Sequence, residues 1–339
     1  MGAFVTMFSR PRSGLAARFF AVAATVVATA PALAQGPIEI NAIAIAQFDK
    51  SDGELRRFGK LEFRGGLELT SPAKEFGGIS GLRMDPDGAR FVAVTDTGRW
   101  LRGRITYSGS APVRIADAEM AQMLGADGKK LPRGWFDTEA VAQDGGTVYV
   151  GLERVHRVLK YDFGKSGFQA RGVPIPVPVD FKGLPNNRGI ESLAVMPTGS
   201  PIAGALVAIS EAPLDGNGDI KAYLIGGPRP GVFSIKRTED FDITDCALLP
   251  GGDLLLLERR FSIVRSAARI RRVAGGDILP GTLVNANVVF QADFSQQIDN
   301  FEAIGVHRTA AGDTILTLVS DDNFSPLQRT LLMQFKLIE

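Results

Sequence analysis

Acidic side chains recur at two positions of a pattern that repeats along the chain. Each copy has a carboxylate or hydroxyl near the start of one short apolar run and an acid at the end of the next run. The first positions hold Ser80, Glu139, Glu191, Asp245 and Glu302, and the second positions hold Asp96, Glu153, Glu211, Glu258 and Asp321. Carboxylate oxygens are the ligands that a hard cation such as Ca²⁺ prefers. The residue types therefore indicate a calcium site, provided that the fold brings these positions together.

The composition excludes metal sites built from sulfur or imidazole ligands. The chain of 339 residues has one cysteine, Cys246, and two histidines, His156 and His307. Zinc and iron–sulfur centres need more thiolate or imidazole ligands than these residues supply. A single cysteine also excludes an internal disulfide.

Arginines beside these acids leave a second interpretation open. Arg154, Arg188, Arg259 and Arg260 each lie within a few positions of an acid of the pattern. Many carboxylates in a partly dry cleft repel one another, so something cationic must offset them. A bound metal ion would do this, and so would bidentate arginine–carboxylate pairs. In the second interpretation the acids are structural, because they cap strand ends and pair with arginines of neighbouring repeats.

The elements that carry the acids repeat with a period of more than fifty residues. Each copy consists of an apolar strand, a turn rich in Gly, Pro or Asp, and a second apolar strand. The first positions, at residues 80, 139, 191, 245 and 302, are 59, 52, 54 and 57 residues apart. This period is typical of the four-stranded blade of a β-propeller. The sequence therefore predicts an all-β propeller with five repeats, in which each hairpin brings its two acidic positions to one mouth of the channel.

The two ends of the chain are predicted to share the last blade. The fifth copy has no room for an outer strand, and the apolar runs 40–48 and 61–69 could supply it. Strands from both ends would close the ring and leave no free sheet edge. Six blades are an alternative if the N-terminal region contributes more than one closing strand. A two-sheet sandwich is a weaker alternative, because it does not explain the regular period.

The first 34 residues have the pattern of a signal peptide. Three arginines precede an apolar run over 19–30, which is short for a membrane span, and Ala32 and Ala34 fit the small-residue rule for cleavage. We expect cleavage before Gln35, a single domain over 35–339, a periplasmic or secreted location and no membrane span after cleavage. The net charge of +1 argues against a nucleic-acid partner. We also expect a monomer.

Several segments resemble one bacterial family. They are Phe76–Leu82, Thr95–Leu101, Asn187–Leu193, Ile243–Asp245, Leu257–Arg260, Asp299–Glu302, Ser320–Phe324 and Gln328–Leu332. Together they resemble the phytase-like family, also described as "esterase-like activity of phytase", from about Phe63 to Leu337. The resemblance implies a secreted or periplasmic β-propeller with phosphoester or ester hydrolase activity. It assigns no catalytic residues.

The leading functional hypothesis is calcium-assisted hydrolysis of a small phosphorylated or ester substrate. The expected calcium ligands are Asp96, Glu153, Glu191, Asp245, Glu258, Glu302 and Asp321. The residues expected to clamp phosphate oxygens are Arg188, Arg259 and Arg260, and Glu139 or Glu211 is the expected general base. The alternative is a non-catalytic propeller that binds a periplasmic partner or an envelope glycan, because a propeller fold does not by itself imply catalysis.

Overall fold

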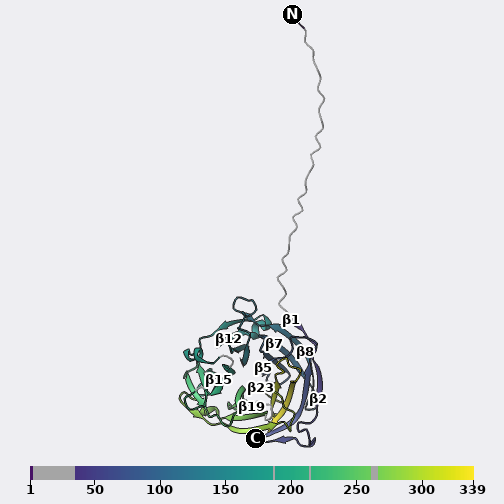
Figure 1. Ribbon diagram of the computed structural model, residues 1–339, viewed down its shortest axis with the longest axis vertical. Coiled ribbons are helices and arrows are strands. Elements are labelled where there is room, and N and C mark those ends of the chain that lie inside the picture. Colours follow the sequence, from purple (N-terminus) through teal and green to yellow (C-terminus); the bar gives the residue numbers. More distant parts are fainter. Residues whose placement is uncertain (3–34, 186–187, 214, 261–265) are drawn as a thin grey trace. The chain divides into compact units, whose positions relative to one another are not determined.

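Five mainly antiparallel sheets surround a central axis and form a five-bladed β-propeller (Figure 1). The protein is seen in a computed structural model that describes residues 1–2, 35–185, 188–213, 215–260 and 266–339. The predicted signal peptide falls almost entirely on residues 3–34, which lie outside the described residues. Among the residues that the structure describes, no helix is long and apolar enough to cross a membrane.

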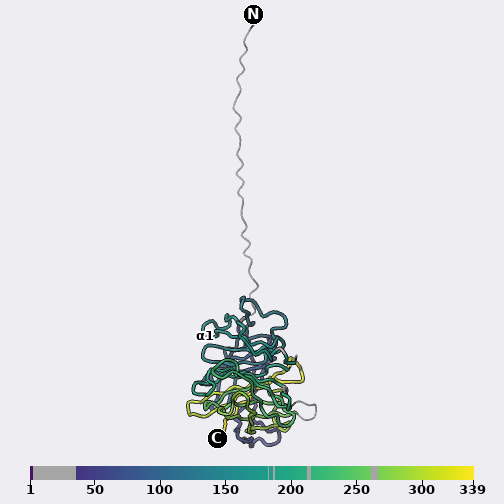
Figure 2. The backbone as a smooth tube through the Cα atoms, turned by 90° about the vertical axis from the view of Figure 1, so that its left-hand side faces the viewer, coloured from purple at the N-terminus to yellow at the C-terminus, as the bar shows by residue number. Residues whose placement is uncertain are grey.

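The first two blades follow the chain from the inner strand to the outer strand. Blade 1 consists of β5 (Ile79–Met84), β6 (Arg90–Thr95), β7 (Arg99–Ser108) and β8 (Ala111–Gln122), with β1 (Gln35–Pro37) outside. Blade 2 consists of β10 (Thr138–Asp144), β11 (Thr147–Leu152), β12 (Arg157–Asp162) and β13 (Arg171–Pro174), with β9 (Leu124–Gly125) outside. The helix α1 (Phe163–Ser166) follows β12 and lies on the side of the ring away from the C-terminus (Figure 2).

The remaining blades have the same order of strands. Blade 3 consists of β14 (Ile190–Val195), β15 (Leu206–Pro213), β16 (Ile220–Ile225) and β17 (Gly231–Ile235), with β21 (Leu283–Val284) outside. Blade 4 consists of β18 (Asp242–Leu248), β19 (Leu254–Arg260), β20 (Ala267–Val273) and β22 (Asn287–Asp293). Blade 5 consists of β23 (Phe301–Arg308), β24 (Thr314–Ser320), β25 (Thr330–Leu337), β4 (Leu61–Thr70) and β2 (Asn41–Ile45), with β3 (Arg57–Phe58) paired to β4.

Strands from both ends of the chain close the ring, as the sequence predicts. The N-terminal strand β4 pairs antiparallel with the C-terminal strand β25 from Leu61 opposite Leu337 to Leu69 opposite Thr330. The N-terminal strands β2 and β4 both join the fifth sheet, so they complete that blade and form no sixth one. Aromatic packing stabilises the closure, because the ring of Phe335 lies 5.0 Å from that of Phe48 and 5.4 Å from that of Phe63.

A β-bulge interrupts each inner strand near its start. In every inner hairpin the register skips one residue, and the skipped residues are Ser80, Glu139, Glu191, Thr244 and Glu302. A bulged residue has no partner across the ladder, and its side chain is re-aimed relative to its neighbours. The five bulges therefore place five equivalent side chains around the axis at one mouth of the propeller.

Candidate functional site

A pocket of about 230 Å³ at this mouth is lined almost entirely by charged groups. Its lining residues are Asp96, Asp137, Glu139, Glu153, Arg154, Glu191, Glu211, Arg259, Glu302, Asp321 and Asn323. Eight of these residues are acids and two are arginines, so the formal charge of the lining is −6 when every group is ionised. We call this pocket the acidic mouth.

The bulges supply three carboxylates to the acidic mouth. In blades 2, 3 and 5 the bulged residues are Glu139, Glu191 and Glu302, and all three line the pocket. In blades 1 and 4 the bulged residues carry hydroxyls that bond to the backbone of the next blade. Ser80 Oγ donates to the carbonyl of Thr138 at 2.6 Å, and Thr244 Oγ1 donates to that of Phe301 at 3.0 Å. The hydroxyls therefore join neighbouring blades, whereas the glutamates face the pocket.

The ends of the second strands supply the next set of side chains. In four blades the residue at this position is an acid. Its backbone N–H donates to the carbonyl oxygen of the residue just before the inner strand. These acids are Asp96, Glu153, Glu211 and Asp321. In blade 4 the equivalent residue is Arg259, which lies opposite Asp242 in the strand register. The repeat therefore places four acids and one arginine around the pocket.

Arg259 is the cation that contacts the pocket carboxylates most closely. Its guanidinium donates to Glu302 and to the side-chain oxygen of Asn300, and it lies 3.6 Å from Glu211. The other arginine of the lining, Arg154, is more exposed and pairs with Asp137 at 2.5 Å. Arg259 therefore brings one positive charge beside two carboxylates, and most of the remaining acids face one another.

Burial and mutual repulsion raise the pKa values of these acids. Burial, followed by the charges of Asp137 and Glu302, raises the pKa of Glu139 well above its usual value. Burial and Glu139 do the same for the pKa of Glu191. Burial also raises the pKa of Glu302 to about 7, although Arg259 opposes the shift. The acidic mouth therefore holds protons near neutral pH when no cation compensates its charge.

The pKa values of two acids at the second-strand ends are raised in the same way. Burial and the neighbouring charge of Asp321 raise the pKa of Asp96 to about 7, and burial raises that of Asp321 to about 6. Asp96 Oδ1 is buried without a hydrogen-bond partner among the residues described. It reaches this position because residue 78 is a glycine with φ of +62°, where a Cβ atom would lie 2.2 Å from Asp96 Oδ1. An unsatisfied carboxylate oxygen is costly when it is buried.

Among the described residues, two groups of carboxylate oxygens are close enough to bind a metal ion. One oxygen from each of Asp137, Glu139 and Glu153 lies within 4.8 Å of the others, and the same holds for Glu153, Glu191 and Glu211. Glu153 belongs to both groups. The donors are all carboxylate oxygens, which suits calcium better than zinc or copper. The lining therefore fits a hard divalent cation.

The family model for "Phytase-like: Esterase-like activity of phytase" matches residues 74–324. The chain belongs to this phytase-like family. No curated protein matches the sequence.

Solved structures similar to the phytase-like chain have low sequence identity to it. Glutaminyl cyclase from Myxococcus xanthus is 13% identical, with a TM-score of 0.40 over 78% of this chain and 92% of that one. PQQ-bound aldose sugar dehydrogenase from Streptomyces coelicolor is 11% identical, with a TM-score of 0.43 over 88% and 98%. The WD40 domain of Toxoplasma gondii coronin is 6% identical, with a TM-score of 0.41 over 89% and 87%.

Two of the expected calcium ligands lie outside the acidic mouth of the phytase-like chain. Asp245 is fully buried, and its carboxylate binds Arg83, while Glu258 is fully buried between Arg269 and Arg271 at 2.6 and 2.9 Å. In blade 4 the sequence pattern selects Asp245, which lies one residue after the bulged position of the inner strand. On the second strand it selects Glu258, which lies one residue before the position that faces the pocket. The equivalent residues are Thr244 and Arg259. The structure thus corrects the expected placement of Asp245 and Glu258, since arginines already satisfy both carboxylates.

The expected phosphate-binding arginines occupy three different surroundings. Arg259 lies in the acidic mouth, as described. Arg188 is exposed, and its charge, like that of Arg259, opposes the burial that raises the pKa of Glu211. Arg260 does not line the acidic mouth; it pairs with Glu239 at 3.3 Å and lies over the ring of Phe241. Arg260 points away from the acidic mouth because successive residues of a strand face opposite sides.

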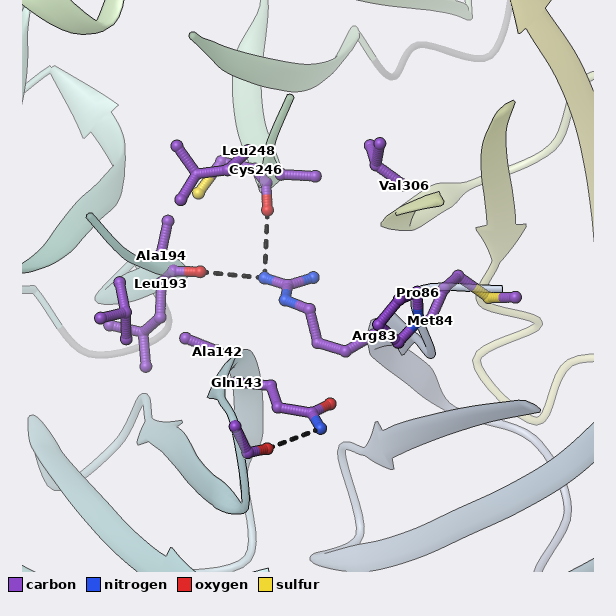
Figure 3. Close-up of a pocket in the computed structure, with 13 residues that line it drawn as sticks. Arg83, Met84, Pro86, Ala142, Gln143, Leu193, Ala194, Cys246, Leu248 and Val306 are labelled. Atoms are coloured by element: carbon purple, nitrogen blue, oxygen red, sulfur yellow. Dashed lines mark hydrogen bonds between the residues drawn. The ribbon is translucent and has the colours of Figure 1, made fainter. Parts of the chain in front are cut away.

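Sequence reasoning gave no role to Arg83. Its guanidinium points into the centre of the ring and donates to the carbonyls of Leu193 and Cys246 at 2.9 and 3.0 Å (Figure 3). A cavity of about 330 Å³ lies around it, lined mainly by apolar side chains of the inner strands. An arginine inside the apolar inner strand Ile79–Met84 was the one available signal, because a charge is rarely buried without a partner.

Proposed function

We propose that this phytase-like propeller hydrolyses a small phosphoester in the acidic mouth, with a divalent cation, calcium, held by the pocket carboxylates. The observation that carries the proposal is the excess of eight acids over two arginines in one pocket. Structural ion pairs do not account for this excess, because within the part of the chain that the structure describes Arg259 and Arg154 contact only Glu302, Glu211 and Asp137 among the acids of the lining. Membership of the phytase-like family supports hydrolysis.

The residues that would hold the cation are those whose oxygens already converge. They are Asp137, Glu139 and Glu153 in one group, and Glu153, Glu191 and Glu211 in the other. Asp96, with its unsatisfied oxygen, is a further candidate. When bound, calcium would neutralise phosphate oxygens and increase the acidity of water. Asp245 and Glu258 have no part in this proposal.

The side chains of the pocket can also bind the substrate and hold a proton. Arg154, Arg188 and Arg259 are the cations beside the acids, and their guanidinium groups can donate to phosphate oxygens. With the cation held by Glu153, Glu191 and Glu211, the carboxylate of Glu139 is left free, and it is then the strongest candidate for the general base, because its pKa is raised. A base works best when its pKa lies near the working pH. Glu211 is a weaker base, since Arg259 stabilises its ionised form.

We further propose that the protein works in the periplasm or outside the cell. This location rests on the signal-peptide pattern of the first 34 residues.

The test is release of phosphate from phytate and from simple phosphomonoesters, with calcium and with a chelator. A carboxylic ester in the same panel distinguishes phosphoester from ester hydrolysis. Glu139→Gln should lower kcat by about 10²–10⁴-fold, which is the usual contribution of a general base. Asp117→Asn is the matched control, because Asp117 pairs with Arg104 on the exposed surface.

Two outcomes would contradict the proposal. The first is the absence of turnover with calcium at every pH tested. If calcium then still raises Tm, the protein is a calcium-stabilised scaffold, which is the alternative from the sequence. The second is turnover that Glu139→Gln and chelation leave unchanged, since the reaction would then occur elsewhere.

A further inference from the structure

A second cavity adjoins the acidic mouth between blades 4 and 5. Its volume is about 270 Å³, and Arg259 lines both cavities. Asn300 also lines the second cavity, and its side-chain nitrogen donates to Glu302 Oε1 at 2.9 Å. A ligand that contacts Arg259 can therefore extend from the acidic mouth into this cavity.

The second cavity differs from the acidic mouth in chemistry. Its walls include Ala267, Phe294, Ile298 and Leu327, and Phe294 and Leu327 are 49% and 91% exposed. Large apolar side chains grouped around a hollow on the surface are typical of a binding site.

The charged groups of this cavity already have partners. Asp299 accepts the backbone N–H of Arg329 at 3.2 Å and pairs with its guanidinium at 3.5 Å. Arg260 pairs with Glu239. The apolar surface is therefore the part of this cavity that is best suited to bind a ligand.

One loop connects the two cavities. Within residues 321–329, Asp321 and Asn323 line the acidic mouth, whereas Leu327 and Gln328 line the second cavity. Hydrogen bonds brace the loop, because the backbone N–H of Asn323 donates to Asp321 Oδ1 at 2.7 Å and that of Gln328 to the carbonyl of Ser325 at 3.2 Å. The loop therefore holds the apolar wall at a set position relative to the acids.

We propose that the second cavity is a specificity subsite for an apolar arm of the substrate. This inference rests on the proposed hydrolysis in the acidic mouth and names its substrate class: a phosphomonoester whose leaving group is one aromatic ring or a short alkyl chain. A volume of 270 Å³ is slightly below the range of pockets that enclose drug-sized ligands, which suits a small arm. A polyphosphorylated polyol fits less well, because it offers no apolar group and brings further negative charge to a pocket of formal charge −6.

The test compares the affinities of benzylphosphonate and methylphosphonate by calorimetry, with calcium present. These probes share the charged group and are not hydrolysed. We expect the wild-type protein to bind benzylphosphonate about tenfold more tightly, which is at the low end for a group placed in an apolar pocket. Leu327→Ser and Phe294→Ser should each remove most of this preference. Leu283→Ser is the matched control, because Leu283 is 50% exposed on β21 and lines neither cavity.

Equal affinity for the two probes would overturn the subsite, and so would the absence of binding of both. If Leu327→Ser and Phe294→Ser both retain the preference for benzylphosphonate, the subsite is also overturned. Turnover of glycerol phosphate, measured in parallel, reports on the proposed hydrolysis without using the subsite. Turnover with equal affinities would refute the subsite alone, whereas a clear benzyl preference without any turnover would refute hydrolysis alone.

Discussion

The guanidinium of Arg83 on blade 1 binds both carboxylate oxygens of Asp245 on blade 4, each at 3.1 Å. These blades are not neighbours in the ring, so the pair crosses the axis of the propeller. Arg83 also donates to carbonyls of blades 3, 4 and 5, and Asp245 accepts the backbone N–H groups of Cys246 and Ile304. The pair therefore ties four blades together below the acidic mouth.

Asp245→Asn should destabilise the protein strongly and independently of calcium. The substitution leaves the buried guanidinium of Arg83 without its counter-ion, and breaking such a pair costs about 3–5 kcal/mol in the free energy of unfolding. Glu258→Gln should behave in the same way, because Arg269 and Arg271 converge on that carboxylate. Denaturant unfolding with calcium and with chelator measures both effects. If the variants lose stability only when calcium is present, Asp245 and Glu258 are calcium ligands and this prediction is wrong.

Glu139→Gln and Glu302→Gln should both stabilise the protein in chelator, and Glu139→Gln should have the larger effect. Burial and the neighbouring carboxylates raise the pKa of Glu139. Neutralising this residue therefore relieves repulsion and stabilises the metal-free protein. Burial raises the pKa of Glu302 to about 7, so neutralising this residue is also favourable, but the gain is smaller because the contact with Arg259 is lost. A tenfold change in the acid dissociation constant of a group corresponds to about 1.4 kcal/mol in the free energy difference between its two protonation states.

Thermal melts with calcium and with chelator measure this pair of variants. Both should show a smaller rise of Tm on adding calcium than the wild type, because each loses a charge beside the metal. Destabilisation by Glu139→Gln in both conditions would support the purely structural interpretation of the acids.

Stability without metal should fall as the pH rises from about 4 to about 7. The pKa values of Asp96 and Glu302 are raised to about 7 in the folded protein and lie near 4 in the unfolded chain. Between these values the folded state binds more protons than the unfolded state, so the free energy of unfolding decreases with pH and levels off above about 7.

Tm measured across this range in chelator tests the slope. Calcium should reduce the decrease, because it favours the ionised carboxylates, and Asp96→Asn should flatten it. Below pH 4 the trend reverses, since hydrogen bonds lower the pKa values of Asp215 and Asp293 in the folded state. A stability that rises steadily from pH 4 to 7 in chelator would show that the mouth carboxylates are fully paired.

The repeat of strands and turns was sufficient to predict much of this molecule. Apolar runs separated by turns at a period above fifty residues specify the blades, because each blade must bury both faces of its sheet. The same repeat predicted that N-terminal strands complete the fifth blade, because the fifth copy has no room for an outer strand. The acids of blades 2, 3 and 5 were also placed correctly beside one another, since a hairpin joins the start of one strand to the end of the next.

Blade 4 and the axis were decided only by the tertiary structure. Thr244 and Asp245 are adjacent in sequence, and both fit the first position of the pattern. Glu258 and Arg259 are also adjacent, but only Glu258 is the acid that the second position of the pattern requires. A shift of one residue along a strand turns a side chain to the opposite face, so only the hydrogen-bond register assigns Arg259 to the acidic mouth and Asp245 to the axis. The sequence also did not predict the partner of Arg83. Arg83 and Asp245 are 162 positions apart in sequence, and no local sequence pattern indicates which groups meet across the ring.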